Sequence, residues 1–228
     1  MIAENFKIVA DKVAERCVKC GRSTSEVTII AVSKTQPLSS IRSAFSYGII
    51  DFGENKAQEL RDKYAELKIE ANWHFIGHLQ TNKVKYVIEP AKLIHSVDSV
   101  KLAEGVNRKA EAAGLVKEIL FEVNTSGEES KFGLQSGEDV LKLLEFCNNL
   151  GSIRVKGLMT MAPYTDNEFV IRSCFSGLRK ALEKVNSYGF NLTELSMGMT
   201  NDYELAVEEG ATLLRIGTAI FGERNYAV

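Results

Sequence analysis

The sequence predicts an α/β protein, a (β/α)8 barrel (TIM barrel) with one extra helix at its N-terminal end. Eight short apolar segments alternate with helical segments along the 228 residues. Such an alternation is typical of a parallel sheet covered by helices. An open doubly wound sheet has the same alternation, but no GxGxxG motif follows the first strand segment, and eight repeats in this length favour the closed barrel. No linker or change of composition divides the chain, so we predict a single domain over residues 1–228.

The N-terminal half begins with an amphipathic helix over 3–19, where apolar residues such as Phe6 and Val9 recur at helical spacing. The run 27–34 predicts a strand buried on both faces, because five of its first six residues are apolar and Ser33 and Lys34 follow them. The next elements are a helix from Pro37 to Gly48, a strand over 49–53, a helix over 56–68 with Ala57, Leu60, Tyr64 and Leu67 as its apolar stripe, a strand over 72–78, a short helix over 81–88 and a strand over 92–97.

The C-terminal half continues this pattern. A helix follows Ser99, whose side chain can cap it, and ends at Ala113 before Gly114. A strand over 117–123 leads into a polar loop over 124–133. The remaining strands cover 153–159, 192–197 and 212–216, and the remaining helices cover 137–148, 167–188 and 201–208.

Composition and charge argue against several classes of protein. The net charge is 28 − 30 = −2 and no block of like charge stands out, so we expect no nucleic-acid or anionic membrane surface. No apolar run reaches the roughly 18–20 residues of a membrane helix, and the first residues lack the pattern of a secretory signal. The lone Cys17-x-x-Cys20 pair does not complete a zinc site. We therefore expect a cytoplasmic protein whose four cysteines are reduced thiols.

Lys34 is the first candidate for chemistry. It follows a buried strand, and the carboxyl ends of barrel strands are where the loops share one mouth. An ammonium group beside low-dielectric walls loses hydration, so its pKa falls. Such an amine can condense with an aldehyde, of which pyridoxal phosphate (PLP) is a common biological example. A solvated lysine at a strand end is the plain alternative.

The last two strands end in residues that suit a phosphate group. Ser196 and Thr218 offer hydroxyl donors, while Gly198 and Gly217 allow the backbone to approach a ligand closely. Barrels often bind phosphate between the loops that follow strands seven and eight. Tight turns would also need small residues, which explains the glycines but not the paired hydroxyls.

Four further residues near strand ends are candidates for ligand contacts or for structural roles. Arg215 stays charged and must find an acceptor, either in a ligand or in a structural ion pair. Asn55 could hydrogen-bond a ligand, although we favour a role as the cap of the next helix. Either Thr200 or Asn201 could cap the helix that follows strand seven.

The three histidines do not have the spacing of a metal site. His74, His78 and His95 are spread over two predicted strands. His78 sits at a strand end, where it could line the mouth of the barrel. A structural histidine is the commoner outcome for such a position.

Seven segments, in order along nearly the whole chain, resemble the pyridoxal phosphate homeostasis protein family. Proteins of this family are single-domain PLP-binding proteins found in bacteria and eukaryotes. Thr200 stands where serine is frequent in the family, and it keeps the hydroxyl. The matching segments are IAVSKT (30–35), FGEN (52–55), HFIGHLQTNK (74–83), SKFG (130–133), GLMTM (157–161), SMGMTND (196–202) and RIGTAIFG (215–222).

The resemblance implies a fold-type III barrel, like the N-terminal domain of alanine racemase, with PLP as its cofactor. It gives each candidate residue a role. The implied cofactor-binding residues are Lys34, which holds PLP as a Schiff base, Ser196, Gly217 and Thr218 at the phosphate, Arg215 at the pyridine nitrogen and Asn55 near the cofactor.

The resemblance also implies a role in intracellular PLP homeostasis, with little or no catalysis. A cationic arginine beside the ring nitrogen leaves that nitrogen neutral, so the ring is a weaker electron sink than with an aspartate partner. Six residues follow Gly222, whereas the racemases continue into a β domain with a second acid/base tyrosine. We therefore expect a monomer that contacts PLP-dependent apo-enzymes transiently. Two alternatives stay open: a compact PLP-dependent racemase or lyase, and an enzyme for a different phosphate metabolite.

Overall fold

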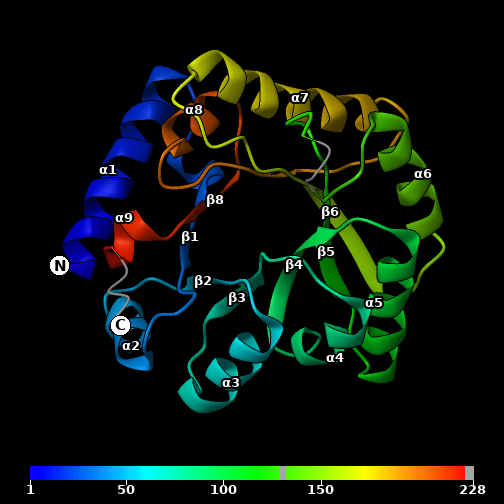
Figure 1. Cartoon of the computed structure of the whole chain (residues 1–228), viewed down its shortest axis with the longest axis horizontal. Coiled ribbons are helices and arrows are strands. Elements are labelled where there is room, and N and C mark those ends of the chain that lie inside the picture. The colour runs from blue at the N-terminus through cyan, green and yellow to red at the C-terminus, as the bar shows by residue number, and fades with distance from the viewer. Residues whose placement is uncertain (129–131, 224–228) are drawn as a thin grey trace.

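The computed structural model describes residues 1–128 and 132–223. Residues 129–131, which include two residues of the SKFG segment, and residues 224–228 lie outside the described part. Within the described ranges, eight parallel strands pair in chain order and close into a barrel (Figure 1). The predicted (β/α)8 fold is therefore confirmed.

The strands are short segments in which buried apolar residues predominate. The barrel closes between its first and last strands, where Ile30 lies opposite Arg215 and Ala31 lies opposite Ile216. The strands are β1 (Thr28–Val32), β2 (Asp51–Glu54), β3 (Asn72–Phe75), β4 (Ala91–Val97), β5 (Lys117–Glu122), β6 (Ile153–Met159), β7 (Glu194–Ser196) and β8 (Leu213–Ile216).

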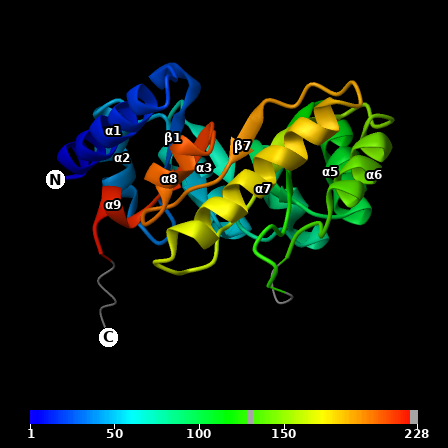
Figure 2. The ribbon, with the colours of Figure 1, turned by 90° about the horizontal axis from the view of Figure 1, so that it is seen from above.

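Helices cover the outside of the barrel, and α1 (Ile2–Lys19) is the extra helix that the sequence predicts. It packs along α8 and α9, on the side of the molecule marked N in Figure 2, and buries Val9, Val13 and Cys17. The other helices are α2 (Leu38–Ser46), α3 (Ala57–Leu67), α4 (Val84–Val87), α5 (Val100–Ala112), α6 (Gly137–Cys147), α7 (Glu168–Asn186), α8 (Tyr203–Glu208) and α9 (Thr218–Phe221), with two 3-10 turns, η1 (Thr24–Glu26) and η2 (Thr81–Lys83).

Several details differ from the sequence prediction. The predicted caps are wrong, because no side-chain hydrogen bond from Ser99 caps α5, and the N-cap residue of α8 is Asp202 instead of Thr200 or Asn201. The apolar stripe predicted for α3 is wrong at one position, because Tyr64 is 38% exposed while the neighbouring Lys63 is only 6% exposed. The short helix predicted over 81–88 is divided into η2 and α4. The buried lysine becomes part of the site described below.

The interior of the barrel is partly polar. Most of the apolar core lies between the strands and the surrounding helices. Inside the barrel, one buried apolar cluster consists of Ile30, Leu93, Leu120, Met159 and Leu213. The barrel strands also bury the polar residues His74, His95, Ser196 and Arg215. Among the described helices, none has both the length and the apolar composition of a membrane span.

Candidate functional site

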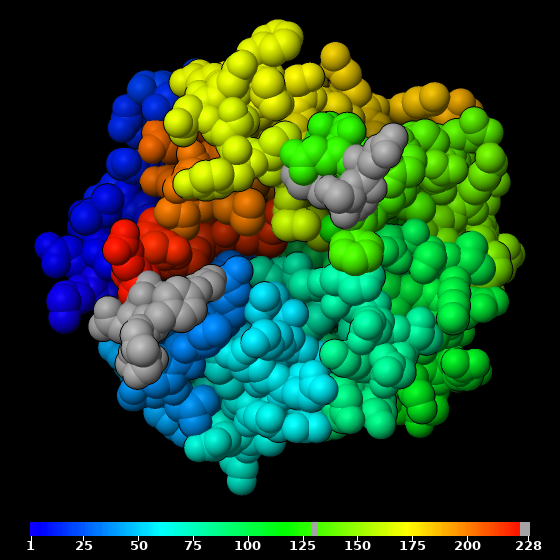
Figure 3. Space-filling model, in the orientation of Figure 1, coloured from blue at the N-terminus to red at the C-terminus, as the bar shows by residue number. Residues whose placement is uncertain are grey.

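A cavity of about 710 Å³ opens where the strands end and the following loops meet. On this face, Figure 3 shows a hollow between the red and orange C-terminal segments and the blue and cyan N-terminal segments. A cavity of this volume accommodates a cofactor-sized ligand. Five of the six residues that the sequence singled out line it: Lys34, Asn55, Arg215, Gly217 and Thr218. The sixth, Ser196, is fully buried.

The backbone around Lys34 is fixed by a buried ion-pair cluster. Ser33, which precedes it, donates its hydroxyl to Glu54 Oε1 at 2.6 Å. The Ser33 carbonyl accepts a hydrogen bond from Lys63 Nζ at 2.7 Å. Lys63 therefore reaches from α3 to the end of β1, which explains why a lysine occupies the inner face of that helix.

Lys63 also binds two carboxylates, so its charge is compensated where it is buried. Its Nζ lies 2.8 Å from Glu54 Oε1 and 2.7 Å from Glu59 Oε1. Glu59 Oε1 also accepts the Thr35 N–H at 2.6 Å. Thr35 has a φ of 64°, a left-handed conformation that β-branched residues avoid unless their surroundings impose it. We call Ser33, Glu54, Glu59 and Lys63 the Lys34 clamp.

The two carboxylates of the Lys34 clamp differ in environment. Burial raises the pKa of Glu54 above its ordinary value, although the Lys63 charge and the Ser33 hydroxyl oppose this shift. Burial also acts to raise the pKa of Glu59, but hydrogen bonds from Lys63 and Thr35 outweigh it and lower that pKa. The ammonium of Lys63 thus favours the ionised form of Glu54, which is fully buried.

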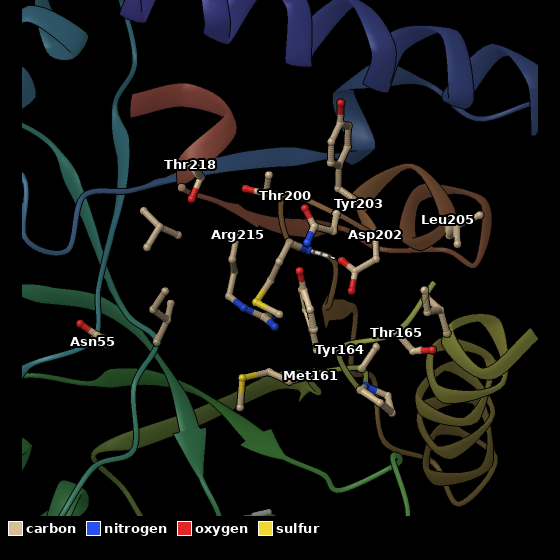
Figure 4. Close-up of a pocket in the computed structure, with 18 of the residues that line it drawn as sticks. Asn55, Met161, Tyr164, Thr165, Thr200, Asp202, Tyr203, Leu205, Arg215 and Thr218 are labelled. Carbon is tan, nitrogen blue, oxygen red and sulfur yellow. Dashed lines mark hydrogen bonds between the residues drawn. The ribbon is translucent and has the colours of Figure 1, made fainter. Parts of the chain in front are cut away.

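Arg215 contributes a buried positive charge to the cavity. Its guanidinium donates to the Thr160 carbonyl at 2.8 Å and to Ser196 Oγ at 2.6 Å. Burial lowers the pKa of Arg215 to about 10, against the attraction of Asp202 and Glu122. The group remains charged at neutral pH. Figure 4 shows Arg215 near the centre of the view, between Asn55 and Asp202.

Ser196 connects Arg215 to two buried histidines. Ser196 Oγ lies 2.8 Å from His95 Nδ1, and His95 Nε2 lies 3.0 Å from His74 Nδ1. His74 Nε2 in turn lies 3.1 Å from Asp51 Oδ1. We call Ser196, His95, His74 and Asp51 the histidine chain. The sequence assigned no role to His74 or His95, and the chain they form was not predicted.

The loop after β7 brings a residue to the cavity that the sequence treated only as a possible cap. Thr200 lines the cavity, and its Oγ1 accepts the Ala219 N–H at 3.4 Å beside the first turn of α9. The chain reverses at Gly198, whose φ is 93° and where a Cβ would lie 2.6 Å from Ala206 Cβ. A glycine is required at that turn. Thr200 and Thr218 therefore lie near each other, while Ser196 lies in the barrel wall.

The proposed capping role of Asn55 is wrong. Helix α3 is preceded by Lys56 as its N-cap residue, and no side-chain hydrogen bond caps it. Asn55 instead lines the cavity, and its buried Oδ1 has no hydrogen-bond partner among the described residues. Gly77 packs against its backbone, because a Cβ there would lie 2.2 Å from the Asn55 carbonyl oxygen. The asparagine is held in place and has an acceptor to offer a ligand.

Two further cavity residues lie outside these networks. Glu122, at the end of β5, lines the cavity and is 4% exposed. Its burial, together with the charge of Asp98, raises its pKa to about 7, although Arg215 acts in the opposite direction. His78 also lines the cavity and stacks on Phe132, with ring centroids 3.9 Å apart. In the part of the chain that is described, no group of three His, Cys, Asp or Glu side chains is arranged to hold a metal.

Comparison with known proteins identifies the family. The chain matches the model of the alanine racemase N-terminal domain over residues 8–225. It is 41% identical over 225 residues to a pyridoxal phosphate homeostasis protein of Aquifex aeolicus, covering 98% of both chains. The chain belongs to the pyridoxal phosphate homeostasis protein family. Its counterpart in Escherichia coli K12 is 37% identical over 238 residues, with coverage of 99% of this chain and 98% of the other.

Solved structures of similar proteins support the family assignment. Synechococcus elongatus PipY with PLP bound is 36% identical, with a TM-score of 0.81 over 92% of this chain and 100% of the other. A structure described as that of an unknown protein from Bifidobacterium adolescentis has a TM-score of 0.89 at 37% identity, over 96% of this chain and 94% of the other. A Leuconostoc mesenteroides histidine racemase is 14% identical with a TM-score of 0.75, over 97% of this chain and 57% of the other, which shows the shared fold alone. The family resemblance inferred from the sequence is confirmed.

Proposed function

We propose that this member of the pyridoxal phosphate homeostasis protein family binds PLP in the cavity at the carboxyl ends of the strands. In this role it would keep PLP reactive but sequestered in the cell, with little or no turnover of its own. The observation that carries the proposal is that an amine, a buried guanidinium and two hydroxyls line one cavity of about 710 Å³. They are contributed by Lys34, Arg215, Thr200 and Thr218.

The residues present fit PLP chemically. PLP supplies an aldehyde that bonds to a lysine amine, and an aromatic nitrogen that accepts a hydrogen bond. Lys34 is the amine that the Lys34 clamp holds at the end of β1, and Arg215 is the donor for the ring nitrogen. The unpaired Oδ1 of Asn55 can accept a hydrogen bond from the cofactor. The covalent bond and the polar contacts together would hold one orientation.

Our assignment of the phosphate contacts differs from the sequence expectation at one residue. The Ser196 hydroxyl is bound by Arg215 and His95 and does not line the cavity. We therefore assign the phosphate to Thr200 and Thr218, with the Gly217 backbone beside them. Ser196 becomes a support for Arg215.

The weak catalysis that we propose follows from Arg215. A guanidinium with a pKa of about 10 donates to the ring nitrogen without protonating it, so electron withdrawal by the ring stays weak. This favours storage and transfer of PLP over chemistry at a substrate α-carbon. We further propose a cytoplasmic monomer that passes PLP to apo-enzymes in transient contacts.

Reduction with borohydride followed by mass spectrometry tests the proposal. Protein incubated with PLP should acquire a pyridoxyl group on Lys34, and Lys34→Ala should lose both this adduct and the visible absorbance of bound PLP. Lys63→Arg is a matched control. It replaces the buried lysine that binds the Ser33 carbonyl but keeps a cation there, so this variant should still form the adduct on Lys34. An adduct on another lysine, or none, would contradict the proposal.

The rival reading, a compact PLP-dependent racemase or lyase, predicts a different result. Such an enzyme would exchange the α-proton of an amino acid for deuterium over many turnovers, in a reaction that needs Lys34. We expect exchange too slow to complete many turnovers with any of the common amino acids.

A further inference from the structure

Five strands of the barrel each contribute one residue to a continuous line of buried polar groups. Arg215 on β8 is followed by Ser196 on β7, His95 on β4, His74 on β3 and Asp51 on β2. Ser196 and His95 are fully buried, and His74 is 4% exposed. Asp51 is the first residue of β2 and its side chain is 17% exposed. The line therefore joins the cavity to the amino end of a strand.

The donor at the cavity end fixes the direction of the first hydrogen bond. A guanidinium can only donate, so Ser196 Oγ accepts from Arg215 at 2.6 Å. The hydroxyl proton of Ser196 then needs an acceptor, since an unpaired buried donor is destabilising. In the described part of the chain, the remaining partner of Ser196 Oγ is His95 Nδ1 at 2.8 Å. His95 Nδ1 must therefore be the unprotonated nitrogen of that ring.

The same logic fixes both imidazoles. Burial, with a further contribution from the charge of Arg215, lowers the pKa of His95 well below its ordinary value, so its ring is neutral and carries its proton on Nε2. That proton points to His74 Nδ1 at 3.0 Å, which leaves the His74 proton on Nε2, facing Asp51.

Asp51 completes the line as an ionised acceptor. Burial alone would raise the pKa of Asp51, but His74, a hydrogen bond from Asn72 and the charge of Lys92 together lower it. The carboxylate accepts from His74 Nε2 at 3.1 Å and from Asn72 Nδ2 at 3.0 Å. Every donor in the line thus has an acceptor, and one direction of hydrogen bonding satisfies all of them.

Packing alone does not call for such a line. The interior of a barrel of this type is ordinarily filled with branched apolar side chains, as the cluster around Leu93 and Leu120 shows here. Imidazoles and hydroxyls in the interior lose their contacts with water, which must be replaced. A role linked to Arg215 explains why the polar groups form one connected series instead of separate pairs.

We propose that His95 and His74 are positioning residues for Arg215, which act through Ser196 and are themselves oriented by the carboxylate of Asp51. The series holds the guanidinium in one orientation toward the cavity, so that its free N–H groups are aimed at the ring nitrogen of the cofactor. This inference rests on the proposed binding of PLP. It adds a supporting series of residues that extends across the barrel from the proposed ligand site to Asp51.

The first test measures the protonated nitrogen in each ring. Nitrogen-15 NMR of histidine-labelled protein without added PLP should show both buried imidazoles neutral and protonated on Nε2 at neutral pH. His78 is identified by the loss of its signals in His78→Gln. A proton on Nδ1 of His95, or a doubly protonated ring at either buried position, would overturn the proposed direction.

The second test uses variants and PLP as the probe. His95→Leu should weaken PLP binding by about tenfold, because Ser196 loses its acceptor and Arg215 its fixed support. It should also shift the absorbance maximum of bound PLP. His95→Gln, whose amide can both accept and donate, should recover part of the affinity and of the spectrum. Asp51→Asn should shift the spectrum in the same direction by less.

Leu93→Ala is the matched control for altered packing. Leu93 lies on the same strand as His95, two residues earlier, inside the apolar cluster. Its truncation should lower thermal stability while leaving the absorbance maximum in place. Equal spectral shifts in Leu93→Ala and His95→Leu would mean that the histidines only fill space in the barrel interior, which would overturn the proposal.

The two tests separate this inference from the proposed function. If the wild-type protein forms no adduct with PLP, the proposed function fails, while the NMR result still decides the direction of the line. If PLP binds but its affinity and spectrum are unchanged in both Asp51→Asn and His95→Leu, the positioning role fails alone. Should His95→Leu not fold, Asp51→Asn and the NMR measurement still decide the question.

Discussion

Lys34 follows β1 and Arg215 lies on β8, which pairs with β1, yet different kinds of buried groups support the two residues. The Lys34 clamp is ionic and contacts the backbone on either side of the lysine. The histidine chain is built mainly from neutral side chains and contacts the guanidinium itself. In the roles we propose, the residues on either side of Lys34 are fixed by the clamp, whereas Arg215 receives direct hydrogen-bonded support at its guanidinium.

The comparison predicts the largest loss of stability for a broken Lys34 clamp. Lys63→Met leaves Glu54, which is fully buried, without its cation. We expect the free energy of unfolding to fall by about 3–5 kcal/mol, as for other buried pairs that lose one partner. Urea unfolding measures this loss.

Two controls accompany that measurement. Lys142→Met removes the cation of an exposed pair with Glu138 and should change stability little. Adding Glu54→Gln to Lys63→Met should recover part of the loss, because the uncompensated charge is then gone. If Lys63→Met were no more destabilising than Lys142→Met, the ionic clamp would not be a support.

Glu122 gives the second prediction, because it belongs to neither network. Its pKa is raised from 4.5 to about 7, so the folded state binds more protons than the unfolded state between these values. The stability that Glu122 contributes should therefore be fully present below the unfolded pKa and be lost, by roughly 3 kcal/mol, as the pH rises through about 7. Glu122→Gln should remove this decline. Parallel pH profiles for the two proteins would contradict the raised pKa.

The smallest effect is expected at the far end of the histidine chain. Asn72→Ala removes one of the two hydrogen bonds to the carboxylate of Asp51, which is partly exposed and can recruit water. The free energy of unfolding should fall by about 1 kcal/mol. Chemical denaturation measures it. A loss as large as that of Lys63→Met would mean that the two networks are equally costly to break.

The residues that the sequence could predict are those whose signal is local. Lys34 ends a continuous apolar run, and Arg215 lies in the last strand before a glycine, so their positions at strand ends follow from the pattern alone. Ser196 and Thr200 show why local pattern is insufficient. Both offer hydroxyls after the same strand, and the turn at Gly198 decides which of them reaches the cavity.

The supporting residues depend on how the barrel closes. Asp51, His74 and His95 are separated by 23 and 21 residues, and only the register of the strands brings them together. The role of Lys63 could not be predicted from the sequence for another reason. Helical spacing favours an apolar residue on the inner face of α3, and the sequence offers Tyr64 beside it, so the buried lysine is visible only once Glu54 and Ser33 are in place.

Closure of the barrel between its first and last strands has a consequence for the order in which the site forms during synthesis of the chain. The proposed aldehyde-binding amine comes from the beginning of the chain and the proposed ring and phosphate contacts from its end. A chain still being synthesised would hold the reactive amine without the groups that orient a ligand. Tight binding of PLP would then require that all eight strands of the barrel have folded.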